Sequence, residues 1–146
     1  MAVLENTPKR FRIVLADDNK EMRDEVIQLL GPEFVLVGEV ADGRALVDVV
    51  MKTKPDIGII DISMPIMNGI MAAAEIKRLG SEMKIIFLTV NEDCDFVRAA
   101  FETGASAYVV KRQMASDLPL ALQETLAGHE FVSPGCGTDL EALSLS

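Results

Sequence analysis

Polar residues that could do chemistry follow four short apolar runs of the sequence. Asp17 and Asp18 follow one run, Asp61 ends another, and Thr89 and Lys111 close two more. In an open parallel sheet the carboxyl ends of the strands share one edge, and ligands bind in the crevice there. A single aspartate after a strand usually serves as a turn or helix cap. Three carboxylates, a hydroxyl and a lysine together predict a functional site.

Three carboxylates at one edge would repel one another unless a cation compensates. Two unit charges about 5 Å apart, at an effective dielectric constant of about 20, repel by about 3 kcal/mol, so three pairs cost on the order of 10 kcal/mol. Lys111 offsets part of this repulsion, and a hard divalent cation would offset more. Mg²⁺ binds one or two carboxylates together with waters and phosphate oxygens. The residues therefore predict phosphoryl transfer with a carboxylate as the nucleophile.

The elements that would position these residues alternate along the chain. Five apolar runs rich in β-branched residues predict buried parallel strands at 13–17, 35–40, 57–61, 85–89 and 107–110. Apolar residues at helical spacing predict helices near 22–30, 45–53, 70–79, 93–103 and 116–128. Ser116 would cap the start of the last helix, with Pro119 in its first turn, and Gly80, Gly104 and Gly128 would end three helices. The pattern predicts an α/β fold with helices on both faces of a parallel sheet.

Composition and charge limit the function classes. The 146 residues suffice for one compact domain without disulfides, and a net charge of −9 disfavours direct nucleic-acid binding. No apolar run is long enough to span a membrane and no export signal is evident, so we expect a cytoplasmic protein with Cys94 and Cys136 as free thiols. His129 is the only histidine, which leaves little material for a catalytic triad or a multi-histidine metal site.

Four sequence blocks resemble the signature motifs of the response-regulator receiver family. They are IVLADDN (13–19), PDIGIIDISMPIMNG (55–69), FLTV (87–90) and GASAYVVK (104–111). The resemblance implies a receiver domain at 11–128, an N-terminal tail at 1–10 and a C-terminal tail or linker at 129–146. It also implies a flavodoxin-like (βα)5 fold whose five-stranded parallel sheet has the order 2-1-3-4-5.

The resemblance implies a role for each residue of the cluster. Asp61 matches the phosphoacceptor, and Asp17 and Asp18 match the acidic pair that, with Asp61 and the backbone carbonyl of Ser63, binds Mg²⁺ or Mn²⁺. The remaining matches are the switch hydroxyl, the switch aromatic ring and the phosphate-binding lysine: Thr89, Tyr108 and Lys111. Such a domain receives its phosphoryl group from a sensor histidine kinase. It catalyses only its own phosphorylation and dephosphorylation, so it is not an enzyme in the usual sense.

Two further segments indicate a subclass. EVADG (39–43) and GHEFVSP (128–134) resemble the NarL/LuxR class, whose members usually continue into a DNA-binding helix-turn-helix domain. The resemblance implies transcription regulation, either by a receiver excised from a longer regulator or by a stand-alone receiver that acts through protein–protein contact. The output surface would comprise the fourth helix, the fifth strand and the fifth helix, where phosphorylation would promote self-association or partner binding. Its candidate residues are Asp95, Phe96, Arg98 and Glu102.

Three positions bear on the details of the site. Arg112 follows Lys111 where many receivers have a proline preceded by a cis peptide bond, and a cis bond before a non-proline residue costs about 2.5–4 kcal/mol, so it is not expected here. Ser63 and Asn91 occupy the positions that flank the path of water attack in this family. Neither side chain is a base at neutral pH, so slow self-dephosphorylation is expected.

Two other classes share parts of this pattern. A haloacid-dehalogenase-like phosphohydrolase also uses an aspartate nucleophile with Mg²⁺, but its motif has a second aspartate where Ser63 stands, and this chain is short for that fold with a cap. A flavodoxin-like flavin or nucleotide binder would have a phosphate loop after the first strand, whereas residues 18–21 are too acidic for one. Phosphomonoester turnover and flavin absorbance would distinguish these classes.

Overall fold

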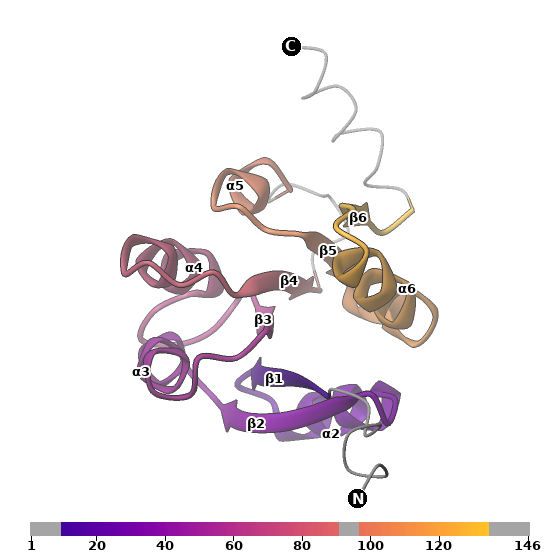
Figure 1. The fold of residues 1–146 in the computed structure, drawn as a ribbon, viewed down its shortest axis with the longest axis horizontal. Coiled ribbons are helices and arrows are strands. Elements are labelled where there is room, and N and C mark those ends of the chain that lie inside the picture. The colour runs from indigo at the N-terminus through magenta and orange to yellow at the C-terminus, as the bar shows by residue number, and fades with distance from the viewer. Residues whose placement is uncertain (1–9, 91–96, 135–146) are drawn as a thin grey trace, which may run out of the picture.

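The chain folds around one parallel sheet of six strands (Figure 1). The structure, a computed structural model, describes residues 10–90 and 97–134. The strands are β1 (Phe11–Ala16), β2 (Phe34–Val40), β3 (Ile57–Asp61), β4 (Lys84–Thr89), β5 (Ala107–Val110) and β6 (Phe131–Val132), in the order β2-β1-β3-β4-β5-β6. Each pair of neighbouring strands is parallel, so the strand carboxyl ends lie at one edge.

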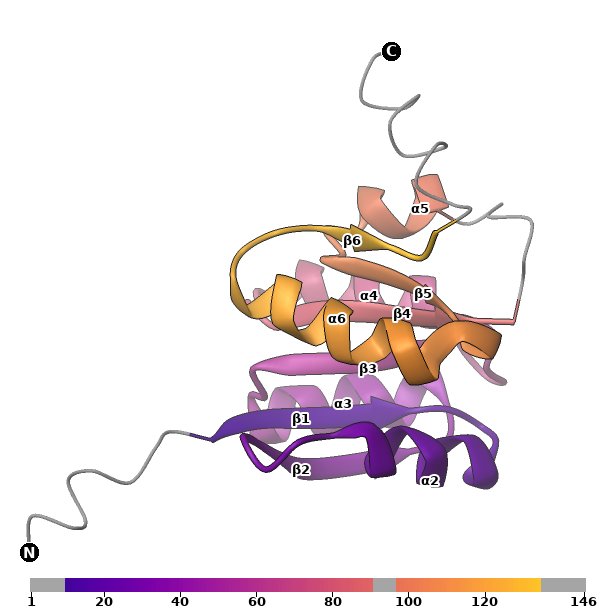
Figure 2. The ribbon, with the colours of Figure 1, turned by 90° about the vertical axis from the view of Figure 1, so that its right-hand side faces the viewer.

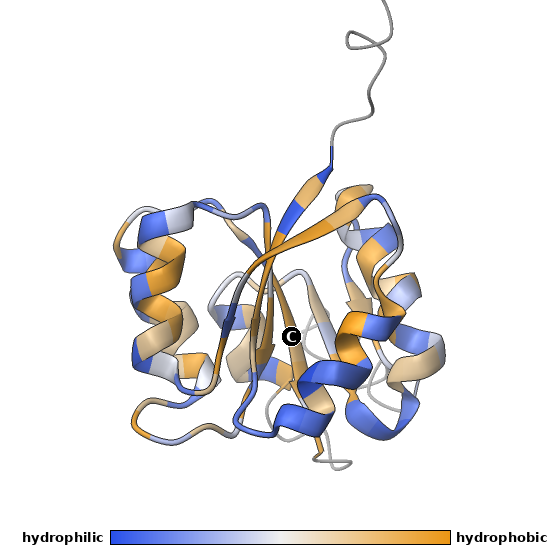
Figure 3. Cartoon of the chain, turned by 90° about the horizontal axis from the view of Figure 1, so that it is seen from below, coloured by the Kyte–Doolittle hydropathy of each residue, from blue (hydrophilic) through white to orange (hydrophobic). Residues whose placement is uncertain are grey.

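Helices cover both faces of this sheet (Figures 1 and 2). One face carries α3 (Gly43–Thr53), α4 (Gly69–Arg78) and α5 (Val97–Glu102), and the other carries α2 (Lys20–Leu29) and α6 (Met114–Leu126). Every residue of β3 and β5 is buried, which explains why these strands are continuous apolar runs without alternation. Figure 3 shows hydrophobic strands in the middle and hydrophilic colour on the outer sides of the helices. None of the described helices is long and apolar enough to cross a membrane.

The predicted strands and their order are confirmed. Each of the five lies within two residues of its expected bounds, and the order 2-1-3-4-5 holds among them. The sheet also contains β6, inside the segment expected to be a tail or linker. Backbone N–H groups of Phe131 and Ser133 donate to the carbonyls of Ser106 and Tyr108 along the open edge of β5. A strand of two residues has too few positions for a recognisable sequence pattern.

Short polar side chains begin three of the helices. The side chains of Asn19, Asp42 and Asn68 each accept a hydrogen bond from the backbone N–H three positions later. The predicted terminating glycines all have positive φ: Gly80, Gly104 and Gly128. The sequence therefore carries its own signals for where these helices begin and end.

The start of α6 was predicted wrongly. A 3-10 turn, η1 (Lys111–Gln113), runs directly into the helix at Met114, so Ser116 lies inside α6 instead of capping it. Pro119 consequently lies in the second turn and not the first. All described peptide bonds are trans, as expected after Lys111. Of the helix predicted at 93–103, residues 93–96 lie outside the described residues.

Candidate functional site

The three predicted carboxylates meet at the carboxyl edge of the sheet. Asp17 and Asp18 directly follow β1, and Asp61 is the last residue of the neighbouring strand β3. One carboxylate oxygen from each lies within 4.8 Å of the others. Asp17 and Asp61 are buried, with exposed fractions of 0% and 4%, whereas Asp18 is exposed. Clustered hard oxygen ligands with one side open to solvent fit a hydrated divalent cation such as Mg²⁺.

Lys111 reaches into this cluster from the end of β5. Its Nζ lies 2.7 Å from Oδ2 of Asp17 and 3.3 Å from Oδ2 of Asp61, and the lysine side chain is only 8% exposed. The other oxygen of Asp17 accepts a hydrogen bond of 2.9 Å from the backbone N–H of Asn19. Both oxygens of Asp17 are therefore engaged by groups of the protein. Lys111 joins residues that are 94 positions apart in the chain.

Burial gives Asp61 an unusual proton affinity. Loss of hydration raises its pKa from 3.8 to about 6, and the nearby Asp17 carboxylate acts in the same direction. Lys111 and the backbone N–H of Ser63 lower the pKa but do not cancel the effect of burial. The Ser63 N–H lies 3.2 Å from Oδ1 of Asp61. At neutral pH the carboxylate is mostly ionised, although its buried surroundings solvate the negative charge poorly.

The loop after β3 is anchored close to the backbone of Asp61. The N–H of Gly69 donates to the carbonyl of Ile62 at 2.8 Å, so the loop returns to the point where it left the strand. A Cβ at position 69 would collide with the backbone carbonyl of Asp61. Gly69 is required because α4 begins directly against the end of β3. This close approach holds the backbone that positions Asp61 and Ser63.

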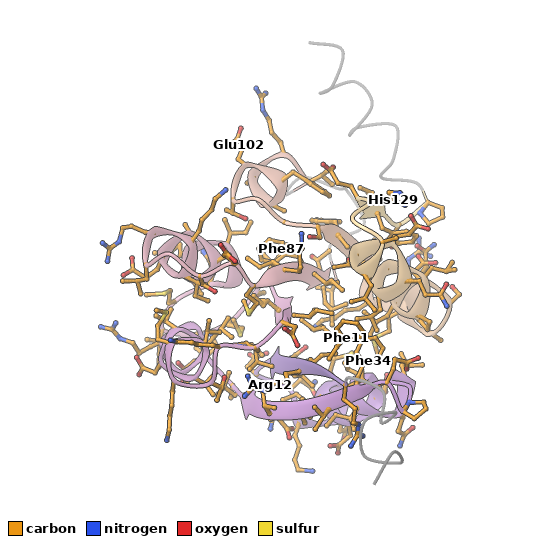
Figure 4. All side chains as sticks on the ribbon, in the orientation of Figure 1. Phe11, Arg12, Phe34, Phe87, Glu102 and His129 are labelled. Carbon is orange, nitrogen blue, oxygen red and sulfur yellow. The ribbon has the colours of Figure 1, made fainter. Side chains whose placement is uncertain are left out.

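The two predicted switch residues lie on neighbouring strands. Thr89, the last residue of β4, is 4% exposed and pairs in register with Val110 of β5. Tyr108 is fully buried and belongs to the cluster that packs under α5, together with Phe87. Figure 4 shows Phe87 within the sheet layer. The structure thus places the whole Tyr108 ring in the core.

Arg23 also contributes to the geometry of the site, a role that was not predicted from the sequence. From the first turns of α2, its Nη1 donates to the backbone carbonyl of Asp17 at 2.7 Å and its Nε to the Glu39 carboxylate at 2.7 Å. This guanidinium, 15% exposed, fixes the backbone from which the acidic pair projects. The sequence signal that could have indicated this role is the position of Arg23, a charged residue one helical turn after the capping residue Asn19. The predicted positions Asn91, Asp95 and Phe96 lie outside the described residues.

Comparisons with known proteins identify the family of this chain. Residues 13–123 match the family described as the response regulator receiver domain, and the chain belongs to that family. It is 32% identical over 127 residues to the transcriptional regulatory protein DegU of Brevibacillus brevis, covering 86% of this chain and 54% of DegU. The chain thus spans about half the length of that relative.

Solved structures show the same fold. A LuxR-family two-component response regulator from Aurantimonas sp. SI85-9A1 superimposes with a TM-score of 0.85 at 29% identity, covering 94% of this chain and all of that one. The isolated receiver domain of RcsB from Salmonella enterica serovar Typhimurium, determined with the phosphomimetic BeF3⁻, gives a TM-score of 0.77 at 27% identity. The match covers 89% of this chain and 98% of that domain. The receiver fold and the NarL/LuxR-class resemblance predicted from sequence are confirmed.

Proposed function

We propose that residues 11–128 are a phosphoacceptor domain that takes a phosphoryl group from a sensor histidine kinase onto Asp61. The observation that carries the proposal is the joint position of Asp61, the Asp17–Asp18 pair and Lys111 at one edge of the sheet. This arrangement combines a nucleophile, oxygen ligands for a divalent cation and a fixed ammonium group. Each is a component that phosphoryl transfer requires.

In the proposed reaction an oxygen of Asp61 attacks the phosphorus of a phosphohistidine on the kinase. The new O–P bond forms as the N–P bond breaks, and the imidazole leaves with the electron pair of that bond. Lys111, already 3.3 Å from Asp61, stabilises negative charge on the phosphoryl oxygens. Mg²⁺ or Mn²⁺ held by Asp18, Asp61 and the Ser63 carbonyl would neutralise further charge there. No small-molecule substrate is turned over, because the domain itself is the phosphoryl acceptor.

The phosphorylated site would then act on the neighbouring strands. The Thr89 hydroxyl would donate to a phosphoryl oxygen, and Tyr108, on the neighbouring strand β5, would respond through packing with α5. The domain would work in the cytoplasm and control transcription, as its resemblance to DegU and the LuxR family suggests. Any contact with DNA would belong to a separate helix-turn-helix domain, and the net charge of −9 agrees with that division.

Intact mass after incubation with acetyl phosphate and Mg²⁺ tests this proposal. The wild-type chain should gain the mass of one phosphoryl group, and Asp61→Asn should gain none because the nucleophilic oxygen is gone. Asp24→Asn, which removes an exposed carboxylate on α2, is the matched control and should label like the wild type. Equal labelling of Asp61→Asn and the wild type would contradict the assignment of Asp61.

A further inference from the structure

A buried serine–aspartate pair joins the segment after α6 to the strand that carries Lys111. Ser133, which follows β6, is fully buried, and Asp117 of α6 is 6% exposed. The Oγ of Ser133 donates to Oδ2 of Asp117 at 2.8 Å and accepts from the backbone N–H of Val110 at 3.0 Å. The segment is therefore fixed by buried side-chain hydrogen bonds in addition to its strand pairing.

Backbone hydrogen bonds hold the same segment along β5. The N–H groups of Phe131 and Ser133 donate to the carbonyls of Ser106 and Tyr108 at 3.0 and 2.9 Å. Figure 2 shows β6 lying beside β5, with α6 below them. Phe131 pairs with Ala107 and Val132 with Tyr108 in parallel register. Residues 129–134 thus cover the edge of β5 that would otherwise be open.

A continuous set of contacts runs from this docked segment to the phosphoacceptor. Ser133 binds the N–H of Val110, and the next residue, Lys111, binds Asp17 and Asp61 through its Nζ. A displacement of the Val110 peptide must move the backbone of Lys111, because the two residues are covalent neighbours. The position of the ammonium group therefore depends on whether Ser133 is docked.

The hydrogen bonds of the Ser133–Asp117 pair make detachment of residues 129–134 from β5 costly in free energy. Without the Ser133 hydroxyl, the buried N–H of Val110 loses its acceptor and the buried Asp117 carboxylate loses a donor. A buried polar group left without its partner carries the full cost of its lost hydration. The Ser116 hydroxyl lies 3.1 Å from Oδ1 of Asp117, the other carboxylate oxygen, and 3.1 Å from the backbone carbonyl oxygen of Gln113. Ser116 therefore offers a comparison on the same carboxylate.

We propose that docking of residues 129–134 on β5 positions Lys111 for the phosphoryl group, and that phosphorylation in turn stabilises the docked segment. Ser133 and Asp117 are positioning residues, since they act through Val110 and Lys111. This inference rests on the proposed phosphorylation of Asp61. Coupling between two equilibria is reciprocal, so the docked segment and the phosphoryl group must favour each other by a comparable factor. The segment that leaves the domain would thereby report the state of Asp61.

Amide hydrogen exchange and beryllofluoride binding, measured on the full chain, test the coupling. In Ser133→Ala the amides at positions 131 and 133 should exchange about tenfold faster, which corresponds to about 1.4 kcal/mol. Beryllofluoride with Mg²⁺ should slow exchange at these amides in the wild type. Its affinity for Ser133→Ala should fall severalfold, because Lys111 is less well positioned. Asp117→Asn, which keeps the side-chain shape, should change both measurements in the same direction.

Ser116→Ala is the matched control and should bind beryllofluoride like the wild type. Far-UV circular dichroism confirms that each variant is folded. If Ser133→Ala and Asp117→Asn exchange faster but bind beryllofluoride with wild-type affinity, the pair is only structural and the inference is overturned, while phosphorylation of Asp61 stands. A wild-type chain that neither gains phosphoryl mass nor binds beryllofluoride would instead overturn the proposed function, and the inference with it.

Discussion

The Asp61 carboxylate is held in buried surroundings that disfavour its ionised form. Its pKa is raised to about 6 chiefly by burial, whereas the unfolded chain has the ordinary value of 3.8. The folded protein therefore binds the proton more tightly than the unfolded chain. The contribution of Asp61 to stability is therefore highest below about pH 4, falls as the pH rises to about 6, and is then constant, with a total loss of about 3 kcal/mol. This loss is part of the cost of a buried carboxylate.

Urea unfolding of Asp61→Asn in EDTA from pH 4 to pH 7 measures that cost. The difference in unfolding free energy between Asp61→Asn and the wild type should grow in favour of the variant by about 2 kcal/mol over this range, because only the wild type ionises a buried carboxylate. Added Mg²⁺ should reduce the change, since a bound cation stabilises the ionised form. A difference that stays constant with pH would show that Asp61 ionises without penalty.

The two carboxylates after β1 should contribute unequally to metal affinity. Both oxygens of Asp17 already accept hydrogen bonds from Asn19 and Lys111, so Asp17 would act mainly through water, whereas the exposed Asp18 is available as a direct ligand. Loss of an outer partner typically weakens metal binding roughly 10–100-fold. By calorimetric titration with Mn²⁺, Asp18→Asn should lose more affinity than Asp17→Asn. Equal losses would contradict this division of roles.

At the scale of elements, Arg23 connects α2 to β2 and to the turn after β1. One guanidinium binds the Asp17 carbonyl and the Glu39 carboxylate, both at 2.7 Å. Arg23→Ala should lower the free energy of unfolding by about 1–3 kcal/mol, because charged hydrogen bonds are lost at partly buried groups. Lys20→Ala, which removes an exposed ion pair with Asp24 on the same helix, should cost less than about 0.5 kcal/mol. Urea unfolding at neutral pH measures the free energy of unfolding of both variants. Equal losses in the two variants would show that the Arg23 contacts do not stabilise the fold.

Sequence patterns predicted the elements whose signals are local and repeated. Strands buried on both faces are continuous apolar runs, and helices bounded by Asn19, Asn68 or a glycine carry their own end signals. The edge where Asp17, Asp61 and Lys111 meet followed from the parallel order of the strands. The start of α6 did not, because the turn at Lys111–Gln113 begins at a lysine held by Asp17 and Asp61, which are far away in the chain. Pairing of Phe131–Val132 with β5 and the contacts of Arg23 are likewise long-range features.

At the scale of the whole molecule, the output surface should change the association state. Residues Arg98 and Glu102 of α5 form an exposed ion pair at 3.3 Å, and Figure 4 shows Glu102 at the outer side of the helix. We expect partner contacts to form at these exposed charges if phosphorylation rearranges Thr89 and Tyr108 as proposed. Sedimentation with beryllofluoride and Mg²⁺ should show a larger species than sedimentation without them. An identical monomer in both states would exclude self-association and leave a different protein as the partner.

The parallel direction of β6 determines from which side of the domain the polypeptide departs. Helix α6 returns the chain to the amino-terminal edge of the sheet, and β6 then carries it back beside β5 toward the edge that holds Asp61. A fluorescent reporter fused after Gly128 would therefore start at the edge remote from the carboxylates. The same reporter fused after Pro134 would start on the side of Asp61, because the chain has by then passed along β6, whose two residues alone span roughly 7 Å. A biosensor built on this domain should use the second junction.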